Sequence, residues 1–166
     1  MSDSIDPGTV IGHVHLKVSD LKRSEDFYRD VLGFDVTARY GDGAVFMSAG
    51  GYHHHIGLNT WHSKDAPPAS PNHPGLFHFA ILYPDRAALG RAVKRVLDKG
   101  WPLDGASDHG VSEAVYLHDP DGNGIELYRD RARSEWQIAA DGSIGMVTAP
   151  LDVRALIEEA DSTALA

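Results

Sequence analysis

Histidine is abundant in this chain, and three histidines stand together in GGYHHHIGLNTWH, residues 50–62. The chain has 10 histidines and 24 Asp or Glu residues but no cysteine, which excludes disulfides and thiolate metal sites. Imidazole is a common transition-metal ligand and the usual proton carrier near neutral pH. The composition therefore points to a site that binds a metal through histidine and carboxylate groups, or that transfers protons. A surface role for the three adjacent histidines stays open.

The charge and length of the chain exclude several classes of protein. Its formal net charge is −9, and no cluster of Lys or Arg appears, which argues against a general nucleic-acid surface. No run approaches the roughly 18 apolar residues of a membrane span, and the polar N-terminus lacks the apolar core of a signal peptide. We expect one domain in a cytoplasmic protein, with neither nucleic acid nor membrane as a partner.

Two segments of the chain repeat each other. HVHLKVSD (13–20) and HFAILYPD (78–85) each begin with His, alternate as a strand does, and end in Asp, at an offset of 65 residues (78 − 13). An amphipathic helical pattern follows each one. Asp is the predicted N-cap and Gly the predicted C-terminal residue of each helix. These residues are Asp20 and Gly33 in the first half, and Asp85 and Gly100 in the second half.

Three short predicted strands follow each helix. They are FDVTAR, AVFMSA and HHHIGLN in the first half, and segments around PLDG, EAVYLHD and GIELYRD in the second half. The turn DPDGNG between the last two is a strong hairpin signal, because Asp-Gly and Asn-Gly tolerate positive φ. Each half is thus a βαβββ module in an α+β fold. A C-terminal extension, residues 131–166, contains one predicted helix in PLDVRALIEEA.

The doubled pattern, together with GHVHLKVSDLKRSEDFYRDVLGF and VYLHDPDGNGIELYRD, resembles the vicinal oxygen chelate superfamily. This superfamily includes glyoxalases, fosfomycin and bleomycin resistance proteins and extradiol dioxygenases. The resemblance covers roughly residues 10–130, with modules at about 10–60 and 75–130. It implies that the paired modules form a cup-shaped mixed sheet around a metal. GGYHHHIGLNTW and DHGVSEAVYLHDPDGNGIELY are most similar to the catechol 2,3-dioxygenases of the superfamily.

The resemblance implies a metal site at four equivalent strand positions, which are His13, Gly57, His78 and Glu126. Two His and one Glu compose the facial triad that leaves positions open on Fe(II). Glycine cannot be a ligand, whereas a glyoxalase would be expected to place a carboxylate at that position. The implied metal is Fe(II), with Mn(II), Zn or Ni as the other candidates.

The resemblance also implies catalytic residues beside the metal. His54 matches the acid–base histidine of extradiol enzymes, although strand alternation favours His55 as the residue that faces the cup. His109 matches a histidine beside the substrate. Tyr116, ten residues before Glu126, matches a tyrosine that donates a hydrogen bond to the substrate.

The function implied is an Fe(II)-dependent extradiol-type dioxygenase that cleaves a catecholic ring. Its partners would be a small aromatic substrate, O2 and a second copy in a homodimer. Two alternatives come from the same superfamily. A resistance transferase of the fosfomycin type should need a basic pocket for phosphonate, and the segments that map to the cup supply almost no basic residue beyond Lys17. A non-enzymatic binding protein of the bleomycin-resistance type would usually lack the three ligands.

Overall fold

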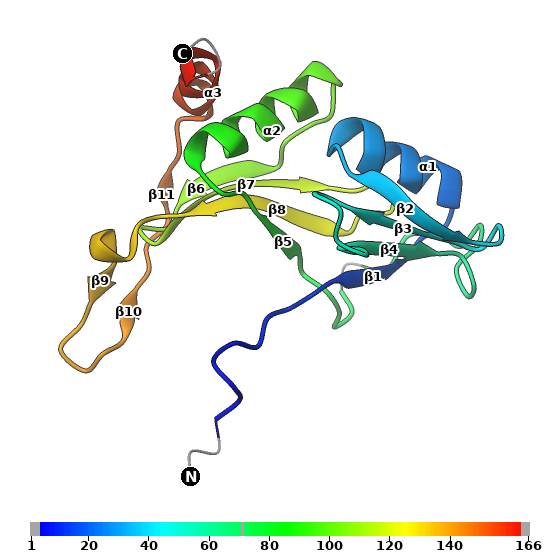
Figure 1. Cartoon of the computed structure of the whole chain (residues 1–166), viewed down its shortest axis with the longest axis horizontal. Helices are drawn as coiled ribbons and strands as arrows, with labels where there is room; N and C mark the ends of the chain where they lie inside the picture. The colour runs from blue at the N-terminus through cyan, green and yellow to red at the C-terminus, as the bar shows by residue number, and fades with distance from the viewer. Residues whose placement is uncertain (1–3, 71, 164–166) are drawn as a thin grey trace.

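The computed structural model of the chain describes residues 4–70 and 72–163 and shows an α+β fold with two large sheets and a small two-stranded one (Figure 1). The first large sheet has the strand order β1 (Val14–Lys17), β4 (Ile56–Asn59), β3 (Ala44–Ser48) and β2 (Asp35–Tyr40). The second has the order β11 (Ala149–Pro150), β6 (Gly105–Asp108), β7 (Ser112–His118), β8 (Gly124–Asp130) and β5 (Phe79–Leu82). Both α1 and α2 lie on one side of the sheets (Figure 1). No helix within the described part of the chain is long and apolar enough to cross a membrane.

The first module follows the predicted order of elements. It contains β1 (Val14–Lys17), α1 (Leu21–Asp26), the π-helical turn η1 (Phe27–Val31), β2 (Asp35–Tyr40), β3 (Ala44–Ser48) and β4 (Ile56–Asn59). The Asp20 side chain accepts a hydrogen bond from the Arg23 backbone N–H, and Gly33 has a φ of 88° after the helical segment. Both predicted helix ends are therefore confirmed.

The second module repeats this order with β5 (Phe79–Leu82), α2 (Arg86–Asp98), β6 (Gly105–Asp108), β7 (Ser112–His118) and β8 (Gly124–Asp130). The Asp85 side chain caps α2 at the Ala88 N–H, and Gly100 follows the helix with a φ of 71°. The predicted turn between β7 and β8 is present. There, Asp119 Oδ1 accepts hydrogen bonds from the backbone N–H groups of Asp121 and Asn123, both at 2.9 Å.

Two strand boundaries differ from the sequence-based prediction. The strand expected around PLDG begins at the last residue of that segment and covers Gly105–Asp108. The strand expected over HHHIGLN begins only at Ile56, so the three histidines precede β4. Strand alternation therefore does not determine where residues 53–55 point.

The two modules share one buried core. Tyr28 lies in η1 and is fully buried. Its hydroxyl donates a hydrogen bond to Asp119 Oδ2 of the second module at 3.0 Å. The Phe27 ring packs against the Trp101 ring with 4.7 Å between centroids. Burial of these large apolar side chains supplies most of the free energy that holds the modules together.

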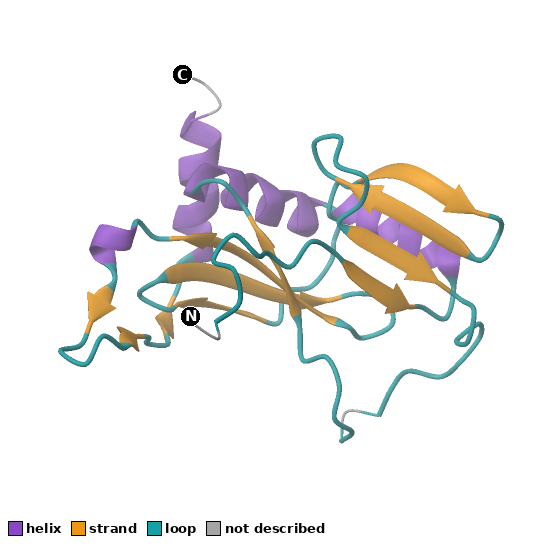
Figure 2. Cartoon of the chain, turned by 60° about the horizontal axis from the view of Figure 1, so that its bottom comes forward, coloured by secondary structure: helices purple, strands orange, loops and turns teal. Residues whose placement is uncertain are grey.

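The C-terminal extension returns along the second module. It comprises η2 (Arg133–Glu135), β9 (Gln137–Ile138), β10 (Ile144–Gly145), β11 (Ala149–Pro150) and α3 (Val153–Thr163), which contains most of the predicted helix. β11 adds an antiparallel strand to the edge of the sheet beside β6, and α3 packs on α2. Figure 2 shows the β9 and β10 ribbons beyond the edge of this sheet.

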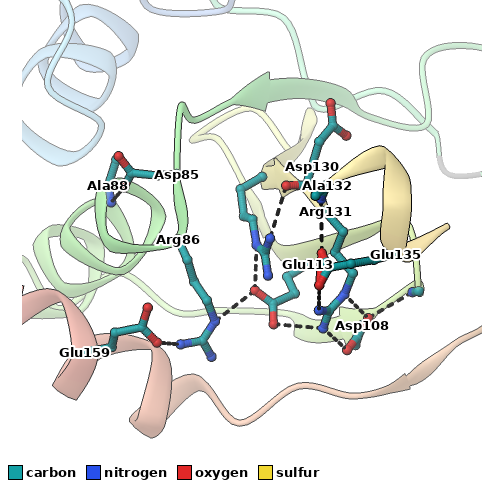
Figure 3. A network of polar contacts seen from close by, with 12 residues as sticks. Asp85, Arg86, Ala88, Asp108, Glu113, Asp130, Arg131, Ala132, Glu135 and Glu159 are labelled. Carbon is teal, nitrogen blue, oxygen red and sulfur yellow. Dashed lines mark hydrogen bonds and ion pairs between the residues drawn. The ribbon is translucent and has the colours of Figure 1, made fainter.

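A buried carboxylate joins strands and helix on the helix-facing side of the second sheet (Figure 3). Glu113 on β7 is 4% exposed. Its Oε2 accepts from Arg86 Nε at 2.9 Å and from Arg129 Nε at 2.8 Å, and its Oε1 accepts from Arg131 Nη2 at 3.2 Å. One carboxylate thus links the start of α2, β8 and the beginning of the extension.

Candidate metal and substrate site

Two of the three predicted metal ligands meet at the edge of the second sheet. His78 directly precedes β5, and Glu126 lies on the neighbouring parallel strand β8, in register with Ala80. His78 Nε2 lies 2.9 Å from Glu126 Oε2. Both side chains are partly shielded, with 31% and 13% of their surface exposed. An imidazole nitrogen and a carboxylate oxygen are two of the three donors that a facial triad requires.

Tyr116 and His109 lie beside this pair. The antiparallel register of β7 and β8 places Tyr116 directly opposite Glu126. The Tyr116 hydroxyl lies 2.7 Å from His109 Nε2 and 3.4 Å from Glu126 Oε1. Burial, followed by the negative charge of Glu126, raises the pKa of Tyr116 to about 12. The phenol is therefore neutral at physiological pH and can donate a hydrogen bond.

His13 lies at the start of the other sheet, next to the three adjacent histidines at residues 53–55. It precedes β1, and its ring centroid is 4.5 Å from that of His54. The His54 ring also packs against Phe46 at 5.1 Å, and its Nδ1 lies 2.9 Å from Nδ1 of His53. Burial lowers the pKa of His54, and nearby His13 and His53 lower it further. A neutral imidazole at this position can accept a proton.

His55 occupies a different environment. Its Nδ1 lies 3.0 Å from the hydroxyl of buried Ser48 and 3.3 Å from the Ala49 backbone N–H, on the strand β3 side. His54, not His55, therefore lies beside His13. This placement agrees with the register that the family resemblance implies and differs from the one that simple alternation favours.

Gly57 lies against an imidazole. The parallel register of β1 and β4 pairs Gly57 with His15, and a Cβ added to Gly57 would lie 2.9 Å from Cγ of the His15 ring. The absence of a side chain at this position leaves room for His15, whose ring also lies 5.7 Å from that of Phe46. Burial lowers the pKa of His15, with a smaller contribution from His13.

The predicted site residues thus form two groups. His78, Glu126, Tyr116 and His109 form one group, and His13 and His54 form the other. Among the described residues, no three His, Asp or Glu side chains lie close enough together to hold a metal ion. The donor types suit a metal, but the chain brings only two of the three proposed ligands into contact.

Sequence reasoning missed one contributor to the site. The backbone of Val147, in the extension, contacts His109 through hydrogen bonds in both directions. No local signal in the sequence shows that residue 147 returns to residue 109.

Comparison with known proteins establishes the family. The Glyoxalase/Bleomycin resistance protein/Dioxygenase superfamily matches residues 10–127, which include every predicted site residue but not Val147. The chain belongs to this superfamily, as its paired modules predicted.

Among its relatives, a catechol-2,3-dioxygenase from Bacillus subtilis (strain 168) is 43% identical over 157 residues, or 95% of this chain and 54% of that protein. Biphenyl-2,3-diol 1,2-dioxygenase 3 from Rhodococcus globerulus is 31% identical over 72% of this chain and 63% of its own length. The chain therefore spans only about half to two thirds of these relatives.

Solved structures show the same fold. A glyoxalase/dioxygenase from Nostoc punctiforme superposes with a TM-score of 0.61 at 20% identity, over 80% of this chain and 99% of that chain. Lactoylglutathione lyase from Agrobacterium tumefaciens superposes with a TM-score of 0.57 at 26% identity, over 75% of this chain and 96% of that chain.

Proposed function

We propose that this protein is an extradiol-type dioxygenase, which opens a catecholic ring and incorporates both atoms of O2. The observation that carries the proposal is the group formed by His78, Glu126, Tyr116 and His109 on adjoining strands. It occurs in a chain that is 43% identical to a protein named catechol-2,3-dioxygenase. In this proposal a phenol and an imidazole that can hold or transfer a proton lie beside two groups that could bind a metal.

The proposed metal is Fe(II), with His13, His78 and Glu126 as its protein ligands. Bound by three residues, such a metal keeps open positions at which a catechol and O2 can bind side by side. Gly57 supports this assignment because it contributes no fourth ligand and leaves its space to His15.

Each remaining side chain has a role of its own in the proposal. His54 accepts a proton from the catechol, because its lowered pKa keeps it neutral near physiological pH. Tyr116 donates a hydrogen bond to a substrate oxygen, since its raised pKa keeps the phenol protonated. His109 holds the Tyr116 hydroxyl in place at 2.7 Å.

A homodimer is the proposed means by which His13 reaches the other two ligands. β1 and β5 are each the outer strand of their sheets, with an unpaired edge. The residues just before them are apolar and exposed: Val10 is 82% and Phe77 is 90% exposed. Moving the modules of one chain against each other would break the buried bond between Tyr28 and Asp119. Contact between two copies would leave that bond intact.

Complementation tests the dimer. His13→Ala and Glu126→Ala variants, each unable to bind iron, are unfolded together and refolded as a mixture. Recovery of iron binding in the mixture, and in neither variant refolded alone, supports a site that is shared between copies. If the mixture does not recover iron binding, the proposal of a site shared between two copies is wrong.

The activity is tested on protein purified without chelator and reconstituted anaerobically with Fe(II). We expect that at least one member of a catechol panel is consumed with matching O2 uptake, and that both atoms of 18O2 appear in the opened product. His78→Ala serves as the control and should lose both iron and turnover. Full iron occupancy without cleavage of any catechol would refute the proposed reaction.

A further inference from the structure

The C-terminal extension holds His109 by two hydrogen bonds to a single residue. The Val147 backbone N–H donates to the His109 carbonyl at 3.1 Å, and the Val147 carbonyl oxygen lies 2.8 Å from His109 Nδ1. Val147 lies outside the superfamily match at residues 10–127. The residue that holds His109 therefore lies in the extension, outside the modules that the superfamily shares.

This contact determines which nitrogen of His109 carries the proton. A backbone carbonyl can only accept a hydrogen bond, so Nδ1 must donate. In a neutral imidazole, Nε2 is then an acceptor. The Tyr116 hydroxyl lies 2.7 Å from Nε2 and has one proton to give, so it donates to His109.

The opposite tautomer would rearrange the site. With the proton on Nε2, His109 would donate to the Tyr116 oxygen, and the phenol proton would turn to the other neighbouring acceptor. That acceptor is Glu126 Oε1, at 3.4 Å. The carboxylate proposed to bind the metal would then be hydrogen-bonded to the phenol.

We propose that residues 144–150 are a positioning segment of the site, which selects the Nδ1–H tautomer of His109 through the Val147 carbonyl. In the substrate-free protein the segment thereby directs the phenol proton of Tyr116 to His109 Nε2, at 2.7 Å, rather than to Glu126 Oε1, at 3.4 Å. The consequence for turnover rests on the proposed dioxygenase function, whereas the tautomer does not.

The structure shows what keeps this segment in place. β11, at the end of the segment, pairs with β6 through Ala149 and Asp108. α3 then packs closely on α2, because Gly90 has no side chain: a Cβ there would lie 2.4 Å from the Leu156 carbonyl oxygen and 2.8 Å from the Ala160 Cβ. Docking of α3 therefore anchors the segment from its C-terminal side.

The test measures the tautomer of His109 in metal-free protein by 15N-detected NMR, at a pH where the imidazole is neutral. His109→Gln assigns the signals. We expect the Nδ1–H pattern in the wild type. Val147→Pro removes the backbone N–H that ties the segment to His109 and should shift the pattern towards Nε2–H. Val147→Ala keeps both backbone groups and loses only an exposed side chain, so it should keep the wild-type pattern.

A remote variant separates this effect from local damage. Gly90→Ala favours the helix α2 but leaves no room for α3, so it should release the extension and shift His109 towards Nε2–H. Amide exchange at Ala149 reports the release, and the chemical shifts of β7 and β8 report that the modules stay folded.

Two results would overturn the inference. One is an Nε2–H tautomer in the wild type, and the other is an unchanged tautomer in a variant whose extension is shown to be released. If the tautomer behaves as expected while the reconstituted wild type cleaves no catechol, the positioning segment stands and the proposed reaction fails.

Discussion

Replacing Glu113 by Gln should destabilise the fold strongly while leaving the candidate site unchanged. Glu113 is 4% exposed, and its two oxygens accept hydrogen bonds from three arginines (Figure 3). Glutamine keeps the shape and one acceptor but removes the charge, and its amide group would face guanidinium donors. Three positive side chains would then remain close together without their shared counterion.

The size of the effect follows from the burial of these groups. Removing one partner of a buried ion pair costs about 3 to 5 kcal/mol. The arginine side chains are 15% to 23% exposed, so water screens part of their repulsion, and the lower end applies. We expect a loss of about 3 kcal/mol in the free energy of unfolding, which corresponds to a drop in Tm of roughly 6 to 12 °C for a chain of this size.

Equilibrium urea unfolding measures the loss, with Glu158→Gln as the matched control. Glu158 pairs with Arg154 on the exposed side of α3, at 2.8 Å and with 64% and 88% of the side chains exposed. That change should cost under about 0.5 kcal/mol. Glu113 and Tyr116 point to opposite faces of β7, so iron affinity should not change. A loss below about 1 kcal/mol for Glu113→Gln would refute the reasoning that this buried network carries stability.

Three further predictions concern the site. His54→Phe should lower kcat by about 10² to 10⁴-fold at unchanged iron content, while His55→Phe should not; the reverse result would show that the wrong histidine has been assigned. Gly57→Glu must push aside the His15 ring, 2.9 Å from the new Cβ, and should suppress cleavage while iron analysis still finds the metal; full activity would contradict the placement of this strand. The Tyr116 phenol should ionise only near pH 12, so the folded state loses stability as the pH rises from 10 towards 12. Tyrosinate absorbance of wild type and Tyr116→Phe should coincide up to about pH 10.5, and an earlier divergence would argue against burial of the phenol.

Local chemistry made much of the fold predictable. Asp20 and Asp85 cap their helices because a side-chain oxygen can satisfy a backbone N–H only two or three residues away. Gly33 and Gly100 end the helical segments because glycine adopts positive φ readily. The hairpin turn at 119–124 also sets a register, which places Tyr116 opposite Glu126.

Strand alternation does not apply at the three histidines. The rule requires an extended strand, but β4 begins at Ile56, after His55. The direction of the preceding side chains depends on what they pack against, which is Phe46 and His13 for His54, and Ser48 for His55. These contacts join residues that are distant along the chain.

The sequence by itself determined the two βαβββ modules, their caps and hairpin, and the residue types that could bind a metal. Those features depend on interactions within a few residues of one another, or on a repeat that can be read directly. Only the tertiary structure placed His78 against Glu126, kept His13 from joining them in one cluster, and brought Val147 back to His109. Such contacts depend on how whole sheets and helices pack, and local conformational preference carries no information about that packing.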